Sequence, residues 1–342
     1  MTEERDARRR PTISDVAALA GVSKGAVSKT FNGGKGISPD TMARIRAAAA
    51  ELSWMPSTAA RAVSGGPARA VGLVMRRPAE LLELDPFFPA LLSGIESVLS
   101  EANYAAVLRF VNDATTEREC YAELIGERRV DGFVLTDLRH RDPRFEWLTQ
   151  LGAAVVVAGS PGRGCPFPSV RTGAAGEIRA LVRHLIDNGH RTIAHVAGPP
   201  GLRHARRRQQ LWAEAVLDGG LTPGPVVVSD FTADGGGRAT RELLDHSPRP
   251  TAIFYANDLM AIAGMSVLAE RGVRVPEDIA VAGFDDISLA NYVTPPLTTV
   301  HCDYRRMGKV ATQMLLAQLR NEEVVQQFTI GAELRLRRST GG

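Results

Sequence analysis

Histidine, cysteine and serine, which often act as metal ligands or nucleophiles, occur in this chain without the spacing that such chemistry needs. The seven histidines, among them His184, His190 and His195, show no metal-ligand spacing, and the three cysteines form no CxxC motif. The sequence also lacks GxSxG, HExxH and GxGxxG after a strand-like run, and GGKG at 33–36 lacks the rest of a phosphate loop. We therefore expect neither an enzyme nor a metal or cofactor site.

Two polar residues instead come directly after strand-like runs, where open α/β sheets bind ligands. Asn257 follows the run 252–255, and Asp285 follows the run 279–283. Asn257 could alternatively cap the helix expected to begin at residue 259, and Asp285 could belong to a turn. The positions favour a ligand cleft, with the capping and turn roles left open.

These positions belong to a region from residue 70 onward in which short β-rich runs alternate with amphipathic helices. This alternation is typical of parallel, doubly wound sheets, and its length indicates two open sheets. The expected strands are 71–75, 105–110, 132–136, 154–158, 192–197, 225–228, 252–255 and 279–283, and the expected helices are 88–101, 116–129, 174–188, 206–218, 238–245 and 259–271. Candidate crossings between the two sheets lie at 160–168, 291–300 and 321–327. The pattern resembles the two-lobed, periplasmic-binding-protein-like α/β architecture, with a ligand cleft between the lobes.

The N-terminal region has a different, all-α pattern of three short helices. Thr12 and Asp15 predict a capping box at the start of the first helix, and Gly21 can end that helix in the left-handed conformation. Ser23 can cap a second helix, and SPD at 38–40 can begin a third. Two helices around a short turn containing glycine are typical of a helix-turn-helix unit. A small helical bundle that binds nothing is the alternative.

Positive charge is concentrated at the helix-turn-helix end of the chain. Residues 1–70 hold 11 Lys and Arg against 6 Asp and Glu, whereas the rest of the chain holds 30 against 32. A basic excess at this end suits binding to a phosphate backbone.

The N-terminus and the cysteines indicate the compartment. MTEERDARRR is charged and lacks an apolar signal core, and no apolar run of about 18 residues occurs. We expect a cytoplasmic, nucleoid-associated protein in which residues 1–10 form a disordered basic arm. Cys120, Cys165 and Cys302 are then expected to be reduced, buried thiols.

Three segments carry a family resemblance: TISDVAALAGVS, AVSKTFN and ISPDTMARIRAAAAELSWMPSTAARAV. Together they resemble the DNA-binding headpiece and hinge of the lactose-repressor (LacI/GalR) family of bacterial transcription regulators. The resemblance implies a headpiece at 11–55, a hinge helix or linker at 56–66, and an effector-binding and dimerisation domain at 67–342. Within this last domain it implies an N-lobe at about 70–164 and 296–323 and a C-lobe at about 165–293 and 326–342.

In the family, the second headpiece helix lies in the major groove. The resemblance implies that base edges are faced by Lys24, Gly25 and Lys29 and that phosphates are held by Thr12, Ser28 and Asn32. Lys29 stands where the family usually has arginine, so the bidentate fork is lost although an ammonium can still reach guanine. Gly25 offers no side chain and costs the helix about 1 kcal/mol. A solvated helix face is the alternative for both lysines.

The hinge of the family folds on DNA and pairs with its twin from a second subunit. Ala60 and Val63 match the positions that enter the minor groove, with valine in place of the usual leucine. A plain flexible linker is the alternative. The resemblance therefore implies a homodimer on a pseudo-palindromic operator in double-stranded DNA.

The family also supplies candidate effector-binding residues in the second domain. The resemblance implies contacts from Phe88, Arg208, Phe231, Asn257 and Asp285. Polar groups that can bind oxygen atoms, together with two aromatic rings, suit a polyol or sugar.

The chain departs from the family pattern around this cleft. The motif at 170–172 is Val-Arg-Thr where the family usually has Val-Asp-Asn, and Leu211 replaces a glycine. The loop RRPAELLELD is longer than usual and carries charges near the mouth of the cleft. A non-sugar effector therefore remains an alternative to a sugar.

The sequence thus predicts a transcription regulator, most simply a repressor, whose operator affinity is controlled by a small molecule between two lobes. A two-lobed small-molecule binding protein without specific DNA recognition is the alternative function.

Overall fold

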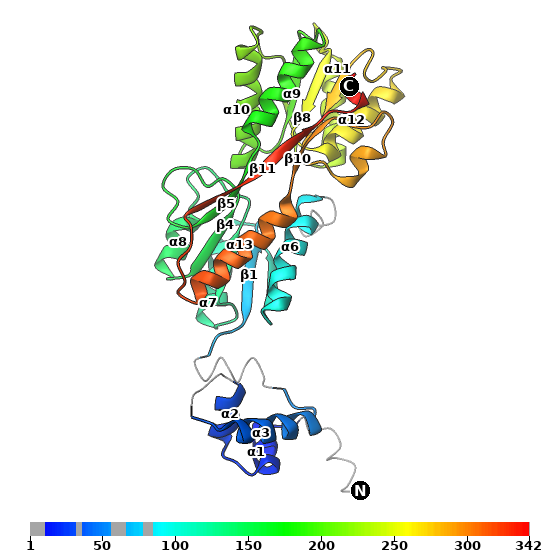
Figure 1. The fold of residues 1–342 in the computed structure, drawn as a ribbon. Helices are drawn as coiled ribbons and strands as arrows, with labels where there is room; N and C mark the ends of the chain where they lie inside the picture. Colours follow the sequence, from blue (N-terminus) through cyan, green and yellow to red (C-terminus); the bar gives the residue numbers. More distant parts are fainter. Residues whose placement is uncertain (1–10, 32–35, 56–65, 78–84, 342) are drawn as a thin grey trace, which may run out of the picture. The chain divides into compact units, whose positions relative to one another are not determined.

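The computed structural model describes residues 11–31, 36–55, 66–77 and 85–341, which belong to two compact units, Met1–Ala68 and Arg69–Gly342 (Figure 1). The predicted arm at 1–10, Asn32, and the hinge residues Ala60 and Val63 lie outside the described residues. Within the described ranges, no helix has the length and apolar character that crossing a bilayer requires.

The first unit contains the three helices that the sequence predicts: α1 (Ile13–Ala20), α2 (Lys24–Phe31) and α3 (Pro39–Glu51). The Asp15 carboxylate accepts hydrogen bonds from the backbone N–H and the hydroxyl of Thr12, both at 2.7 Å. Gly21 ends α1 at φ 64°, and the Ser38 hydroxyl accepts from the backbone N–H of Thr41 at 3.3 Å. These local signals are confirmed, because each depends on residues within one helical turn of one another.

A small core holds the three helices together. Its buried members come from all three helices: Val16, Ala17, Ala20, Val27, Ile45, Ala48 and Ala49. Phe31 and Trp54 pack edge to face beside it, with ring centroids 5.3 Å apart. Because four of the seven buried residues are alanines, the helices approach closely and the core is thin.

The second unit contains two sheets, which confirms the predicted mainly parallel α/β architecture. The larger sheet has the order β10-β11-β5-β4-β3-β1-β2 and the smaller has β7-β6-β8-β9. All pairings are parallel except that of β10 with β11. The strands are β1 (Ala70–Met75), β2 (Ala105–Phe110), β3 (Gly132–Leu135), β4 (Ala154–Ala158), β5 (Ser169–Gly173), β6 (Ile193–Ala197), β7 (Val226–Val228), β8 (Ala252–Tyr255), β9 (Ala280–Ala282), β10 (Thr299–Cys302) and β11 (Gln327–Arg335).

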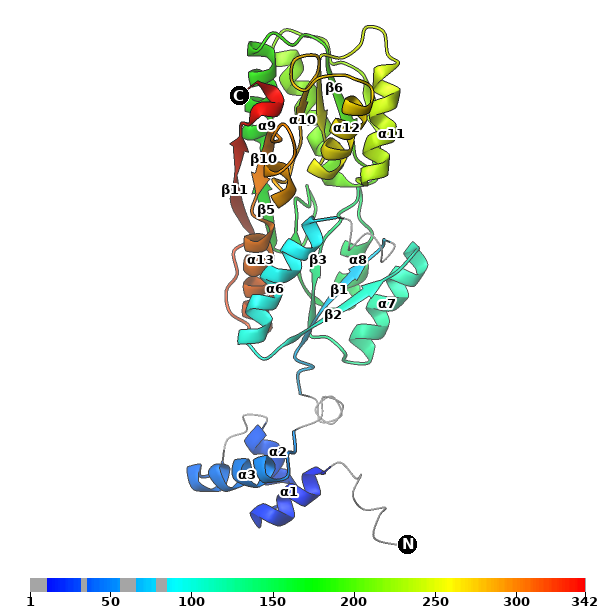
Figure 2. The same ribbon diagram turned by 90° about the vertical axis from the view of Figure 1, so that its right-hand side faces the viewer.

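Helices cover both faces of each sheet. In the lobe built on β1 to β4, α6 and α13 lie on one face and α7 on the other, and in the second lobe α11 and α12 lie on the face away from α9 (Figure 2). The helices are α6 (Phe87–Glu101), α7 (Ala114–Gly126), α8 (Arg144–Gln150), α9 (Ala175–Asp187), α10 (Arg203–Asp218), α11 (Ala233–Leu244), α12 (Asp258–Glu270) and α13 (Tyr304–Leu319).

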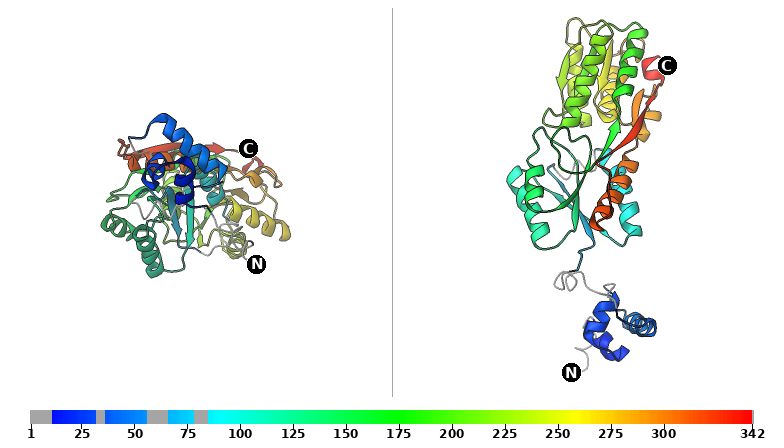
Figure 3. Two further views of the ribbon diagram at one scale, coloured as in Figure 1. Left: turned by 90° about the horizontal axis from the view of Figure 1, so that it is seen from below. Right: turned by 60° about the vertical axis from the view of Figure 1, so that its left-hand side comes forward.

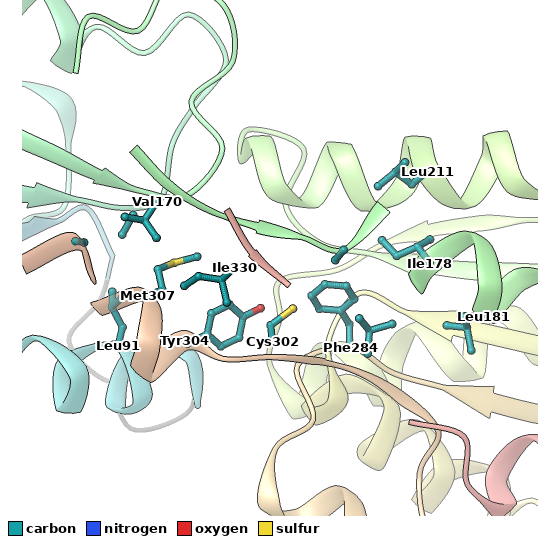
Figure 4. Close-up of a cluster of buried hydrophobic side chains, with 14 of the residues drawn as sticks. Leu91, Val170, Ile178, Leu181, Leu211, Phe284, Cys302, Tyr304, Met307 and Ile330 are labelled. Carbon is teal, nitrogen blue, oxygen red and sulfur yellow. The ribbon is translucent and has the colours of Figure 1, made fainter. Parts of the chain in front are cut away.

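The lobes are connected by the neighbouring strands β5, β10 and β11. β11 pairs with β5 through Gln327–Gly331 and with β10 through Ala332–Arg335, so this one strand joins both neighbours (Figure 3). Isolated bridges then link Ala282 to Thr298 and Asp285 to His301. The apolar core follows the same route, since Phe284, Cys302 and Tyr304 lie in line between Leu181 and Met307 (Figure 4).

Several elements differ from the expectations. We expected no strand for β5, β10 or β11, because β5 and β11 are not continuous apolar runs and the region before β10 is rich in proline. We also expected neither α8 nor α13. Helix α11 begins at Ala233 rather than at 238, since its three consecutive glycines weaken the helical pattern; an added Cβ on Gly236 would lie 2.5 Å from Met260 Cα.

Two glycines let α6 and α13 touch along their backbones. A Cβ added to Gly94 would collide with the carbonyl oxygen of Arg305, and one added to Gly308 would collide with the carbonyl oxygen of Leu91. The close approach of these helices therefore requires glycine at both positions.

The cysteines are partly as expected. Cys120 and Cys302 are buried free thiols, whereas Cys165 is only half-buried, because it lies in the loop between β4 and β5 rather than under a sheet.

Candidate functional site

The exposed side of α2 carries the residues predicted to read DNA. Lys24, Gly25 and Lys29 are exposed, whereas Val27 and Thr30 are buried against the other two helices. Gly25 and Lys29 lie four residues apart and therefore share one face of the helix. The helix thus presents two ammonium groups to solvent while its opposite side is anchored.

Local hydrogen bonds fix the position of α2. The backbone N–H of Ala26 donates to the Ser23 hydroxyl at 3.2 Å, and the Thr30 hydroxyl donates to the Ala26 carbonyl at 2.9 Å. The predicted phosphate-holding residues Thr12 and Ser28 are exposed and half-buried, respectively. A short, firmly placed helix with an open basic face is suited to insertion into a DNA groove.

The second unit contains a cavity of about 890 Å³ that both lobes line. Four of the five predicted effector-binding residues line it: Arg208, Phe231, Asn257 and Asp285. They come from α10, from the loop after β7, and from the residues that follow β8 and β9. The fold therefore brings together residues that are far apart in sequence.

Arg208 is held in place from several sides. Its guanidinium donates to the Ala256 carbonyl at 2.5 Å and to the Tyr304 hydroxyl at 3.2 Å, and it forms an ion pair with Asp285 at 3.4 Å. The Arg208 guanidinium carbon also lies 3.7 Å from the centroid of the Phe284 ring. A guanidinium fixed in this way can donate to ligand oxygen atoms with little loss of side-chain entropy.

Asp285 lies beside Arg208 in an unusual backbone conformation. Its φ is 113°, and its carboxylate accepts a hydrogen bond from the Tyr304 hydroxyl at 2.6 Å. Burial raises the pKa of Asp285 to about 7, although Arg208 and the Tyr304 hydroxyl both act to lower it. The carboxyl group can therefore either accept or donate a hydrogen bond near neutral pH.

Asn257 and Phe231 are tied together. The Asn257 amide nitrogen donates to the Phe231 carbonyl at 3.0 Å, while its oxygen accepts from the N–H of Met260 at 3.0 Å and so caps α12. The Phe231 ring stacks on His204 at 5.4 Å between centroids. Desolvation lowers the pKa of His204 to about 3, so this imidazole is neutral in the cleft. The capping role of Asn257 is thus present, and its second amide hydrogen remains for a ligand.

Phe88 does not line the cavity. Its side chain is 1% exposed on the buried side of α6, whereas the preceding residue, Phe87, lines the cavity. The Phe87 ring lies edge to face on Tyr304, with centroids 4.8 Å apart. One residue along a helix rotates a side chain by about 100°, so the aromatic surface comes from Phe87 instead.

Sequence reasoning missed several groups on the opposite lobe. Arg77 follows β1 and Asp137 follows β3, and their side chains form an ion pair at 2.5 Å. Arg77 also pairs with Asp85 at 3.2 Å, and burial raises the pKa of Asp85 against the effect of Arg77. The rule that finds Asn257 and Asp285, polar residues directly after strands, would have found Arg77 and Asp137 as well.

The cavity combines fixed donors and acceptors with aromatic and apolar surface, which is the chemistry of a small polar ligand site. Among the described residues, no group of histidine, cysteine or acidic side chains has the arrangement of a metal site.

Comparisons with known proteins agree with this architecture. Residues 12–57 match the family described as bacterial regulatory proteins, lacI family, and residues 182–340 match a periplasmic binding protein-like domain. The chain is 37% identical over 320 residues to the HTH-type transcriptional regulator CelR of Thermobifida fusca, covering 92% of this chain and 94% of that protein.

Two solved structures are similar over nearly the whole chain. One is the transcriptional regulator CelR–cellobiose complex, with a TM-score of 0.73, 34% identity and coverage of 96% of this chain and 100% of that one. The other is the lac repressor dimer bound to operator and the anti-inducer ONPF, with a TM-score of 0.84, 27% identity and coverage of 97% and 99%.

Proposed function

Because this chain belongs to the LacI family of bacterial regulatory proteins, we propose that it represses transcription by binding operator DNA through its headpiece, under the control of a small molecule held in the cleft. The observation that carries the DNA-binding part is the exposure of Lys24, Gly25 and Lys29 on a helix whose Val27 and Thr30 are buried. Lys24 and Lys29 then contact base edges, and Thr12, Ser28 and Asn32 contact phosphates.

The proposed effector is a sugar or a sugar derivative. This rests on the donors and acceptors of Arg208, Asn257 and Asp285, on the aromatic surface of Phe231 and Phe87, and on the likeness to a regulator solved with cellobiose. Sugars present many hydroxyl groups and an apolar ring face, and fixed polar side chains beside aromatic rings suit both.

The proposed assembly is a homodimer with one headpiece on each half of a pseudo-palindromic operator. The domains are then the headpiece at 11–55, the hinge at 56–66 and the effector domain at 67–342, with Ala60 and Val63 of the hinge entering the minor groove. The likeness to the lac repressor dimer bound to operator supports this arrangement.

Control then works through the lobes. Effector binding closes the cleft, changes the relative orientation of the N-terminal lobes in the dimer and alters hinge pairing, so operator affinity changes by about 1–3 kcal/mol of coupling free energy. By thermodynamic linkage, operator DNA must change effector affinity by the same factor. We further propose that the protein acts in the cytoplasm, at the nucleoid, and that it has no catalytic activity.

The test is to sequence the DNA that the purified full-length protein retains from random and genomic duplexes, at fixed salt, with and without a panel of sugars and polyols. A pseudo-palindrome whose retention changes with one sugar is the expected result. Retention that depends on salt but not on sequence would instead favour a two-lobed binding protein without specific DNA recognition.

Matched variants locate the DNA-reading surface. K24A/K29A is expected to lose selection of the pseudo-palindrome, whereas R183A/R271A, with the same change in charge on exposed residues of the effector domain, is expected to keep it. Equal loss in both variants would argue against the assignment of α2.

A further inference from the structure

A second cavity adjoins the cleft. It has a volume of about 760 Å³, and its walls come mainly from residues 139–150 and 161–166. His140, Pro161, Arg163 and Arg203 line both cavities. These four residues therefore lie where the two cavities meet.

The inner part of the cleft is close to electrically balanced. Its three lining carboxylates, Asp85, Asp137 and Asp285, each lie within ion-pair distance of Arg77 or Arg208. Two guanidinium groups thus face three carboxylates, one of which, Asp285, has its pKa raised to about 7 by burial. A neutral polyol suits this inner part.

The outer part of the cleft is strongly basic. Five further arginines line the cavity: Arg163, Arg171, Arg203, Arg206 and Arg207. Among the described residues, an ion pair is recorded only for Arg207, with Glu214 at 3.6 Å. Arg203 donates to the Ser160 carbonyl at 3.2 Å and Arg171 to the Thr329 hydroxyl at 3.1 Å, and these neutral acceptors leave the positive charges uncompensated.

Arg203 is held firmly at the junction of the cavities. Its backbone N–H donates to the Leu138 carbonyl of the other lobe at 2.8 Å, and Leu202 forms an isolated bridge with Arg139. The Arg203 guanidinium packs against Gly162, which has φ +79° and where a Cβ would collide with it. Arg163 directly follows this glycine in the chain and lines the same two cavities as Arg203.

The start of α10 adds to the positive potential. Its first turn carries Arg203 and Arg206 and no acidic residue, and the N-cap residue, Leu202, has no side-chain acceptor. The N-terminus of a helix bears partial positive charge. The cationic side chains in this turn add to that charge, so an anion is attracted to this end of the helix. The helix end and the arginine pair thus favour the same kind of ligand.

We propose that the effector carries an anionic group, a carboxylate or a phosphate, which binds between Arg163 and Arg203 while its hydroxyl groups bind near Arg208 and Asp285. The inference rests on the proposed function of the cleft as the effector site. It narrows the ligand from sugars in general to acidic or phosphorylated polyols.

The test uses inorganic phosphate as the probe. The thermal midpoint of the effector-domain transition is measured on the full-length protein, in phosphate and in chloride at equal ionic strength. Phosphate is expected to raise the midpoint of the unchanged protein and of the control R183Q/R271Q, which removes two exposed arginines that line neither cavity. In R163Q/R203Q the rise in thermal midpoint caused by phosphate is expected to fall by at least half. R163K/R203K is expected to recover part of this rise. Equal increments in the two glutamine variants would overturn the proposal.

A second arm separates the two anionic groups. Glucuronate, glucose 6-phosphate and glucose are compared in the same assay, and one of the two anions is expected to give a larger increment than glucose in a manner that depends on Arg163 and Arg203. Glucose matching or exceeding both anions would overturn the proposal.

Operator binding without any probe separates this inference from the proposed function. R183Q/R271Q is expected to bind the operator as tightly as the unchanged protein, since neither arginine lines a cavity and both lie outside the headpiece. If the unchanged protein shows no sequence-specific DNA binding, the proposed regulator function is overturned. If only the response to phosphate is absent, the anion site alone is overturned.

Discussion

The headpiece and the effector domain place their functional side chains in opposite ways. In the headpiece, the proposed contacts to base edges lie on the outside of one eight-residue helix, over a core of seven buried residues. In the effector domain, Arg77, Asp137, Arg208 and Asp285 meet in one cavity although they follow or belong to four different elements. A site on one helix depends on local folding, whereas a site between lobes depends on the whole topology.

The largest expected effect concerns a buried ion cluster of the effector domain. Arg144 is 1% exposed and pairs with Asp142 at 2.6 Å and with Glu117 at 3.5 Å. Arg144→Met leaves these carboxylates buried with less compensation and is expected to cost about 3–5 kcal/mol in the free energy of unfolding of this domain. Urea titration should show the loss in the effector-domain transition alone. If the headpiece loses stability as well, the independence of the two units is contradicted. The control is Arg183→Met, which changes an exposed arginine.

The second prediction concerns pH. Because burial raises the pKa of Asp285 to about 7 from an ordinary 3.8, the folded state holds this proton more tightly than the unfolded state. The contribution of Asp285 to the free energy of unfolding is therefore complete below pH 4 and is lost as pH rises through 7. The unfolding free energy of the unchanged protein minus that of Asp285→Asn should fall over this window, by at most about 4 kcal/mol at about 1.36 kcal/mol per pKa unit.

Asp278 provides the control for this pH series. Hydrogen bonds from Arg274 lower the pKa of this exposed carboxyl to about 2, so its contribution is lost only as pH falls below about 4. Asp278→Asn should give a difference that is flat between pH 5 and pH 8. A flat difference for Asp285→Asn as well would contradict the assignment.

The third prediction weakens the headpiece. Ile45 is completely buried in its small core, and Ile45→Ala is expected to cost about 2–4 kcal/mol, because alanine neighbours let the helices partly close the gap. Operator binding should fall sharply while the effector-domain transition and effector binding stay unchanged. Calorimetry of the full chain tests this, and loss of effector binding would contradict the independence of the two units.

The smallest expected effect is the loss of one helix cap. Ser38→Ala removes the acceptor for the N–H of Thr41 and should lower headpiece stability by about 1 kcal/mol. Ser97→Ala is the matched control, because the Ser97 hydroxyl donates to the Gly94 carbonyl within α6 and caps no helix. Equal effects in the two variants would contradict the role of Ser38.

The same contrast explains what the sequence could predict. Thr12, Gly21 and Ser38 act on neighbours within a turn, so all three headpiece helices were predictable. Eight strands were predictable from their apolar runs. Strand β11 was missed because it is not a continuous apolar run, although its alternation of exposed and more buried side chains is the pattern of a half-buried strand. Whether Phe87 or Phe88 lines the cavity depends on the exact rotation of α6. Packing against α13 fixes this rotation, and no local sequence pattern encodes it.

The contact of Gly94 and Gly308 with the facing helix has a consequence for how this chain can change over generations. What blocks a larger residue at either position is a carbonyl group of the main chain, not a side chain. A side-chain obstacle can be removed by a second substitution, but a carbonyl group is present whatever the residue. Alanine at either position should therefore have no intragenic suppressor at the facing residue, and both codons should stay fixed while the surrounding helix surfaces drift.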